Sequence, residues 1–330
     1  MRIVNKTLLI CVTCFWALTI SLPAKAQQTN EQYIRAVNYL LYLPDGYQQQ
    51  DTLKKWPLLI FLHGSGERGD DLEKVKKHGP PKLVAQGKKF PFIVVSPQTS
   101  QQEQRWSTAD LYALLQSCKQ KYRVDADRIY LTGLSMGGFG TWSLAIEHPE
   151  EFAAIVPICG GGDTAEIWKL RHTAVWCFHG AKDNNVPLAF SQKMISALKV
   201  YNPAAKLTVY PDAEHDSWTA TYNNDSLYQW LLSQKKFEYT QSTTVNTRLL
   251  EKYSGTYVGL ENDTVVVQVK ENGLQATHRN KTFPLLAASE TVFFIDKHLP
   301  VEIQFVTGKA GKATGFIVYE NNKTPFRKIR

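Results

Sequence analysis

Short runs of consecutive apolar residues alternate with segments of helical periodicity between about residue 30 and residue 235. Runs that are apolar at every position are typical of parallel strands covered on both faces. This alternation predicts an α/β fold with a doubly wound, mostly parallel sheet. No long insertion separates the elements, so we expect no large lid. The predicted strands span residues 39–43, 57–63, 92–95, 128–132, 153–158, 174–178 and 206–210, and the predicted helices span 108–121, 136–147, 187–199 and 223–233.

The pattern changes after a polar stretch over residues 239–247, which is typical of a linker. Beyond it, apolar and polar residues alternate in stretches such as residues 264–270 and 316–319, with turn signals between them. Such short alternating segments predict a small all-β domain. We therefore expect an α/β domain over residues 27–238 and a β-domain over residues 248–330.

The first 26 residues have the pattern of a secretory signal peptide. Two basic residues, Arg2 and Lys6, precede an apolar stretch over residues 8–22, and Ala-Lys-Ala at 24–26 provides a small-x-small cleavage site. A membrane anchor is the alternative, but the stretch is shorter than the roughly 20 residues that a span needs. We expect a mature chain that starts near Gln27, keeps no transmembrane anchor after signal removal, and is secreted or periplasmic.

The formal net charge of +8 raises the question of a nucleic-acid partner. The predicted leader carries +3 of it, residues 27–235 carry +1, and residues 236–330 carry +4. Because the α/β domain is nearly neutral, we expect no nucleic-acid partner. The basic excess indicates at most that the β-domain contacts an acidic surface or a glycan.

Cysteine and histidine usage gives no sign of a metal or cofactor. The mature chain keeps Cys118, Cys159 and Cys177, an odd number that cannot form a complete disulfide framework. Cys159 and Cys177 lie in apolar runs and are expected to be buried. No cluster has metal-ligand spacing, so we expect no metal and no cofactor.

Residues 133–137 read Gly-Leu-Ser-Met-Gly, a G-x-S-x-G pattern centred on Ser135. The pentapeptide alone is a weak signal, but here it joins a predicted strand to a predicted helix. A nucleophile elbow requires that context, because glycines on either side let the backbone take a strained turn. Ser135 is therefore the candidate nucleophile.

A serine hydroxyl needs a base to take its proton and an acid to orient that base. Asp183 and His215 follow the ends of two later predicted strands, in the order serine, acid, histidine of α/β-hydrolases. Because such strand ends lie at one edge of the sheet, the three residues can meet there. Asp163 also follows a strand and is the main rival acid. Asp183 could alternatively cap the next helix.

The other histidines and acids fit less well. His63, His148 and His179 each precede Gly or Pro and are compatible with closing turns. Two further acids, Asp212 and Asp216, belong to the same loop as His215. We therefore predict the triad from Ser135, Asp183 and His215.

An oxyanion hole needs two N–H donors. The backbone N–H of Met136, directly after the nucleophile, is the first candidate. The second is the N–H of Ser65 or Gly64, in the glycine-rich loop H-G-S-G-E-R-G at residues 63–69. This loop lacks the pattern of a P-loop and of a dinucleotide-binding turn.

Three motifs carry a family resemblance: residues 62–69, residues 128–138 and residues 178–183. Together they resemble the secreted α/β-hydrolases of the phospholipase/carboxylesterase and prolyl-oligopeptidase-like group, with feruloyl and acetyl-xylan esterases as neighbours. The resemblance covers about residues 33–235 and implies hydrolysis of carboxylic esters through an acyl-enzyme. The segment from about Lys252 to Lys328 resembles a small β-domain appended to other secreted hydrolases.

The expected substrate is a small-molecule or carbohydrate-linked ester with a short acyl or phenolic group. Trp106 and Trp218 are candidates for pocket walls, because flat aromatic faces suit sugar and phenolic groups. Both are equally compatible with ordinary semi-buried tryptophans. Two other functions stay open: a serine peptidase of prolyl-oligopeptidase-like type, and a glycan-binding protein that acts through the β-domain.

Overall fold

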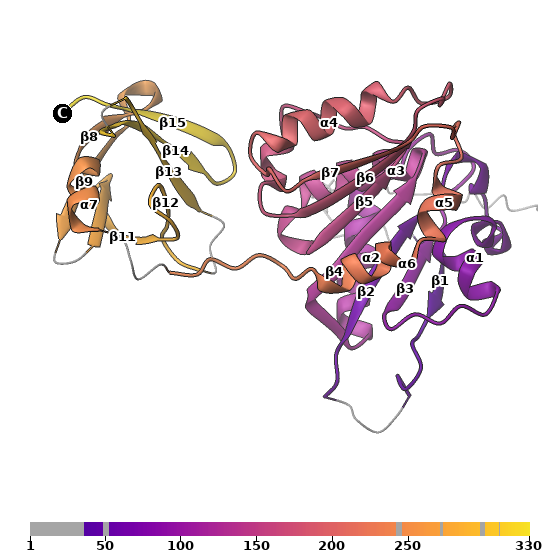
Figure 1. The fold of residues 1–330 in the computed structure, drawn as a ribbon. Helices are drawn as coiled ribbons and strands as arrows, with labels where there is room; N and C mark the ends of the chain where they lie inside the picture. The colour runs from indigo at the N-terminus through magenta and orange to yellow at the C-terminus, as the bar shows by residue number, and fades with distance from the viewer. Residues whose placement is uncertain (1–35, 49–52, 242–245, 271–272, 298–300, 310) are drawn as a thin grey trace, which may run out of the picture. The chain divides into compact units, whose positions relative to one another are not determined.

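The computed structural model describes residues 36–48, 53–241, 246–270, 273–297, 301–309 and 311–330. Within them the chain forms a seven-stranded sheet flanked by helices and, later in the sequence, a closed eight-stranded barrel (Figure 1). The predicted leader, residues 1–26, lies outside the described residues, as do residues 242–245 of the predicted linker.

All seven apolar runs predicted as strands form one sheet, with strand order β1-β3-β2-β4-β5-β6-β7. The first strand pairs antiparallel with β3, and the other neighbours pair in parallel. The prediction of a doubly wound, mostly parallel sheet is thus confirmed. The strands are β1 (Tyr39–Tyr42), β2 (Trp56–Leu62), β3 (Ile93–Pro97), β4 (Val124–Leu134), β5 (Ala154–Ile158), β6 (Ala174–Gly180) and β7 (Lys206–Tyr210).

Two helices have the predicted bounds, α2 and α3, and two others begin two residues later than predicted. The later start of α6 follows from its cap: the side chain of Asn224 accepts from the N–H of Ser226. Helices α1 and α5 were not predicted, because they are too short to show a helical period. The helices are α1 (Gly79–Ala85), α2 (Thr108–Lys121), α3 (Met136–Glu147), α4 (Ala189–Lys199), α5 (Trp218–Tyr222) and α6 (Asp225–Ser233).

Short 3₁₀ helices also occur among the described residues. They are η1 (Ser65–Glu67), η2 (Leu72–Lys77), η3 (Pro149–Glu151), η4 (Ile167–Leu170) and, within the barrel, η5 (Leu260–Asn262). Of these, η1 lies in the glycine-rich loop directly after β2.

The core has two halves, one on each face of the sheet. Side chains alternate along β2, so that Leu58 and Ile60 pack into one apolar cluster while Leu59 and Phe61 pack into the other. The first cluster includes residues of α2, α3 and α4, and the second includes residues of α5 and α6. With both faces covered, every position of β2 is buried, which explains why this strand reads as one continuous apolar run.

The predicted all-β domain is an antiparallel barrel that closes between β9 and β10. Its interior is largely aromatic and contains Tyr253, Tyr257, Phe293, Phe305 and Phe316. Closure depends on the pairing of β15 with β8, which are distant in sequence. The elements are α7 (Thr247–Tyr253), β8 (Gly255–Val258), β9 (Thr264–Lys270), β10 (Gly273–His278), β11 (Lys281–Ala287), β12 (Val292–Phe294), β13 (Glu302–Thr307), β14 (Ala313–Tyr319) and β15 (Lys323–Lys328).

Two further predictions can be compared with the described residues. Cys118, Cys159 and Cys177 are buried free thiols there. In the same residues, no helix combines the length and the apolar character that crossing a membrane requires.

Candidate active site

Ser135 lies in a strained turn between β4 and α3. Its backbone has φ 53° and ψ −117°, in a region that residues other than glycine rarely adopt. The neighbouring glycines make the turn possible: a Cβ atom at Gly137 would collide with the carbonyl group of Leu62, and one at Gly133 with that of Gly137. The strand–turn–helix context expected for a nucleophile elbow is therefore present.

The structure brings Ser135, Asp183 and His215 together from three loops at the carboxyl edge of the sheet. Nε2 of His215 lies 3.0 Å from Oγ of Ser135. Nδ1 of His215 lies 2.7 Å from Oδ2 of Asp183. Serine, imidazole and carboxylate thus form one hydrogen-bonded chain.

The rival acids have other partners. The carboxylate of Asp163 is on an exposed residue and accepts from the N–H of Ala165 at 2.8 Å. Asp212 pairs with Lys182, and Asp216 accepts from the backbone and hydroxyl of Thr219. Among these four acids, Asp183 is the one whose carboxylate bonds His215.

The surroundings of Asp183 keep its carboxylate ionised. Burial by itself raises the pKa of Asp183, but hydrogen bonds from His215 and from the N–H groups of Val186 and Asn185 outweigh burial, and the pKa lies below its ordinary value. Because an ionised carboxylate only accepts hydrogen bonds, Nδ1 of His215 carries the proton. Nε2 is then free to accept the proton of Ser135.

A buried histidine braces the glycine-rich loop after β2. Nε2 of His63 accepts from the N–H of Thr99 at 3.2 Å, so Nδ1 carries the proton and donates to the carbonyl of Gly64 at 2.6 Å. Burial lowers the pKa of His63 to about 4, which keeps the ring neutral at pH 7. The indole N–H of Trp106 donates to the carbonyl of His63 at 3.2 Å, and Arg68 donates to the carbonyl of Ser65.

The three candidate oxyanion donors lie on two segments that approach each other closely. Met136 opens α3, whose first turn packs on the end of β2 and the carbonyl of His63. Gly64 and Ser65 lie near the start of the loop after β2, and a Cβ atom at Gly64 would lie 2.8 Å from the side chain of Leu134. The N–H groups of a helix start next to such a loop are suited to stabilising an anion.

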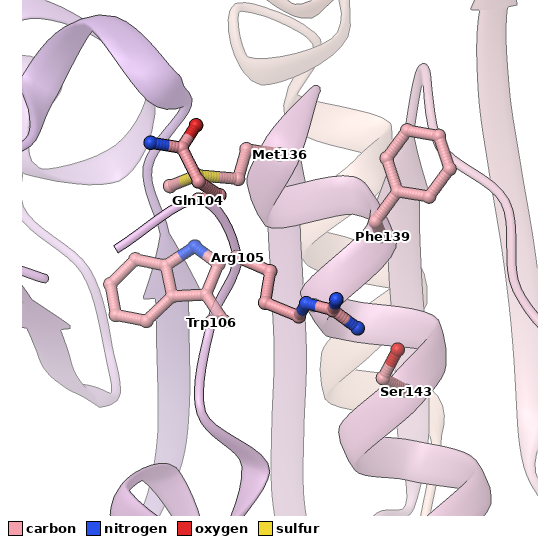
Figure 2. Close-up of a pocket in the computed structure, with 7 residues that line it drawn as sticks. Gln104, Arg105, Trp106, Met136, Phe139 and Ser143 are labelled. Carbon is pink, nitrogen blue, oxygen red and sulfur yellow. The ribbon is translucent and has the colours of Figure 1, made fainter. Parts of the chain in front are cut away.

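A cavity of about 410 Å³ opens beside the start of α3 (Figure 2). Aromatic and apolar side chains form part of its wall, and the side chain of Arg105 extends from its loop toward Ser143 on α3. The lining residues are Gln104, Arg105, Trp106, Met136, Phe139, Gly140 and Ser143.

The two candidate tryptophans have different surroundings. Trp106 lines this cavity. Trp218 does not line it: its ring is buried and lies edge-on to the imidazole of His215, with centroids 5.0 Å apart. The indole N–H of Trp218 also donates a hydrogen bond to Nδ1 of His78, at 3.3 Å.

One group of side chains has the composition of a metal site. Ligand atoms of Cys159, His179 and Asp183 lie within 4.8 Å of one another. Each already has a hydrogen-bond partner: Sγ of Cys159 lies 2.8 Å from Oγ of Ser217, Nε2 of His179 lies 2.8 Å from the carbonyl oxygen of Val186, and Asp183 accepts from His215. Burial raises the pKa of the Cys159 thiol to about 12, so the thiolate form that binds metals is disfavoured. Hydrogen bonding accounts for the cluster.

His63 and His179, which their sequence context makes compatible with closing turns, each contact a part of the candidate site. His63 supports the glycine-rich loop, and Nε2 of His179 lies 3.2 Å from Oδ2 of Asp183. Both rings are completely buried. The sequence carried one sign of this: each histidine directly follows an apolar run and precedes a glycine, at positions 63–64 and 179–180.

A family model described as the dienelactone hydrolase family matches residues 76–242, about half of the chain. The chain belongs to the dienelactone hydrolase family. The resemblance to α/β-hydrolases inferred from the three motifs is thereby confirmed. Residues 239–329 match a second model, a domain of unknown function (DUF3471).

Several proteins that are similar to this chain are described as esterases. A thermostable esterase of known structure is 31% identical, with a TM-score of 0.52 over 60% of this chain and 59% of that chain. The bifunctional acetylxylan esterase/xylanase of Neocallimastix patriciarum is 25% identical over 56% of this chain. The endo-1,4-beta-xylanase/feruloyl esterase of Xylanibacter ruminicola is 25% identical over 63% of it. The matches span 27% and 33% of the length of these two relatives.

Proposed function

We propose that this protein is a serine esterase that hydrolyses carboxylic esters through an acyl-enzyme. The observation that carries the proposal is the hydrogen-bonded chain from Ser135 through His215 to Asp183, with distances of 3.0 and 2.7 Å. Membership of the dienelactone hydrolase family and the esterases among its relatives support the same reaction class.

In the proposed mechanism, Nε2 of His215 takes the proton of Ser135 as Oγ attacks the ester carbonyl. Asp183 stabilises the imidazolium that forms. The N–H of Met136 and that of Gly64 or Ser65 stabilise the oxyanion. His215 then gives its proton to the leaving alcohol, which leaves an ester on Oγ. Water, activated by the same imidazole, repeats the sequence and releases the acid.

The proposed substrates are small-molecule or carbohydrate-linked esters with short acyl or phenolic groups. Trp106 lines the cavity beside Met136, and an aromatic wall suits such a group. The names of two relatives, an acetylxylan esterase and a feruloyl esterase, support plant carbohydrate as the context. We further propose that the protein acts outside the cytoplasm and that the basic β-domain contacts glycans.

The decisive experiment measures turnover of 4-nitrophenyl acetate, methyl ferulate and acetylated xylan by the wild type and by Ser135→Ala. We expect Ser135→Ala to lose at least about 10³-fold in kcat and to lose labelling by a fluorophosphonate probe. Ser226→Ala, which changes an exposed serine on α6, is the matched control and should keep both. Unchanged ester turnover in Ser135→Ala would overturn the mechanism.

The same samples test the two other functions. A rate on peptide amides equal to that on esters would favour a peptidase. Absence of hydrolysis combined with retention on insoluble xylan would favour a glycan-binding protein.

A further inference from the structure

The carboxylate of Asp183 has a second imidazole beside it. The side chain of Asp183 is completely buried, and its Oδ1 accepts hydrogen bonds from the N–H groups of Asn185 and Val186, each at 2.9 Å. Oδ2 faces Nδ1 of His215 at 2.7 Å and Nε2 of His179 at 3.2 Å. The oxygen that serves His215 therefore lies between two histidines.

The hydrogen-bond partners of His179 fix which ring nitrogen carries a proton. Nε2 faces two acceptors, the carbonyl oxygen of Val186 at 2.8 Å and Oδ2 of Asp183 at 3.2 Å. A nitrogen without a proton could bond neither, so Nε2 carries a proton, which it donates to the carbonyl oxygen of Val186 while lying 3.2 Å from Oδ2 of Asp183. Nδ1 lies 2.7 Å from Oγ of Ser191 on α4, which holds the ring in this orientation.

We propose that His179 is a positioning residue of the active site, whose Nε2–H group attracts Oδ2 of Asp183 at 3.2 Å and so holds the carboxylate that orients His215. This inference rests on the proposed function. The donor has two effects. It opposes rotation of the carboxylate away from His215, and it takes up part of the negative charge on Oδ2 that would otherwise stabilise the imidazolium form of His215.

Loss of this donor should change catalysis in a specific way. A less constrained carboxylate orients His215 less well, which lowers kcat while leaving substrate binding intact. A carboxylate without this N–H group beside it also favours the protonated form of His215. The acid limb of the kcat/KM profile should then move to higher pH, an effect that a merely structural histidine would not produce.

Other titratable groups near this site do not account for such a movement. Burial raises the pKa of Cys159 and that of Cys177 to about 12, so both thiols stay neutral through the assay range. Asp216, next to His215 in sequence, is engaged by Thr219.

The test compares His179→Phe, which keeps a ring but no donor, with His179→Gln, whose amide can still donate. We expect His179→Phe to lower kcat about 10- to 100-fold, to leave KM within about twofold, and to move the acid limb upward by about 0.5 pH unit or more. His179→Gln should restore part of both losses. Val175→Ala, a buried change on the same strand, controls for destabilisation and should keep the wild-type profile.

A folded His179→Phe with the wild-type pH profile, and no more loss of kcat than Val175→Ala, would overturn the proposal. If His179→Phe does not fold, Ser191→Ala provides the test. This variant keeps the imidazole of His179 but removes the hydroxyl at Nδ1 that orients the ring. It should move the acid limb in the same direction by a smaller amount, and an unmoved limb would refute the proposal. Failure of the esterase proposal itself would appear separately, as wild-type turnover that does not depend on Ser135.

Discussion

Oδ2 of Asp183 and Nδ1 of His215 lie 2.7 Å apart, although 32 positions separate the two residues in the sequence. The parallel pairing of β6 with β7 accounts for this distance, because it places the loop after each strand at the same edge of the sheet. Two residues that are far apart in the sequence can therefore form a hydrogen bond.

Replacement of the carboxylate by an amide tests the role of this bond. Asp183→Asn keeps the size of the side chain but can present its NH₂ group to His215, which favours the wrong tautomer of the imidazole. We expect kcat for 4-nitrophenyl acetate to fall about 10³- to 10⁴-fold. Asp163→Asn is the matched control, since that carboxylate is on an exposed residue and bonds the N–H of Ala165. A large loss of kcat in Asp163→Asn with little loss in Asp183→Asn would instead make Asp163 the catalytic acid.

The turn at the nucleophile should tolerate no added side-chain atom at Gly137. A Cβ atom there would overlap the carbonyl group of Leu62, and neither backbone can move without disturbing β2 or α3. We expect Gly137→Ala to destabilise the fold by about 3 kcal/mol or more and to abolish activity. Urea denaturation and ester turnover provide the measurements.

Gly66→Ala, in the loop after β2, is the control for this prediction. A Cβ atom at Gly66 has no neighbour within 4 Å among the described residues. This variant should keep both stability and turnover. Equal stability losses in the two variants would show that the close approach at Gly137 is not the cause.

Stability should fall in mild acid because His63 is buried as a neutral ring. Its pKa is about 4 in the folded protein, against about 6.5 in the unfolded chain. Between these values the unfolded state binds a proton that the folded state does not, so the free energy of unfolding decreases as the pH falls. At pH 4.5 the decrease from this group is about 2–3 kcal/mol relative to pH 7.

Urea denaturation at pH 7.0 and at pH 4.5 measures this contribution. His63→Gln has no titratable group at the position, so its decrease between the two pH values should be smaller than that of the wild type by about the same amount. Identical decreases in the two proteins would contradict the assignment to His63.

The two candidate tryptophans should affect catalysis differently. Trp106 lines the cavity beside Met136, whereas Trp218 packs edge-on against His215. Trp106→Leu should therefore lower kcat/KM for methyl ferulate about 10-fold more than for 4-nitrophenyl acetate, because it removes an aromatic wall. Trp218→Leu should lower both by a similar factor. Steady-state kinetics with the two substrates provides the comparison, and equal selectivity in the two variants would remove Trp106 from the substrate site.

Local signals in the sequence predicted much of the fold. Continuous apolar runs such as residues 57–63 are typical of strands covered on both faces, and all seven strands of the sheet were predicted. Helices α2 and α3 were predicted at their observed bounds because each is long enough to show its period. In contrast, α1 begins with Gly-Pro-Pro and spans only seven residues, so its sequence is typical of a turn.

The sequence likewise predicted part of the candidate site, and the rest depended on the tertiary structure. The identities of Ser135, Asp183 and His215 follow from short motifs and their order, because the turn at the nucleophile and the ends of strands leave marks on neighbouring residues. The sequence favoured Asp183, but Asp163 remained the main rival, since both follow strands. Only the three-dimensional pairing of β6 with β7 places one of them, Asp183, against His215.

The sequence by itself thus determined the kinds of element, their order and the residues able to do the chemistry, because these depend on interactions between near neighbours in the chain. Tertiary structure alone decided which distant groups share a hydrogen bond. It placed Nε2 of His179 close to Asp183, and it packed Trp218 against His215, whereas Trp106 lines the cavity. Such choices depend on packing between strands and helices far apart in sequence, and no local pattern records them.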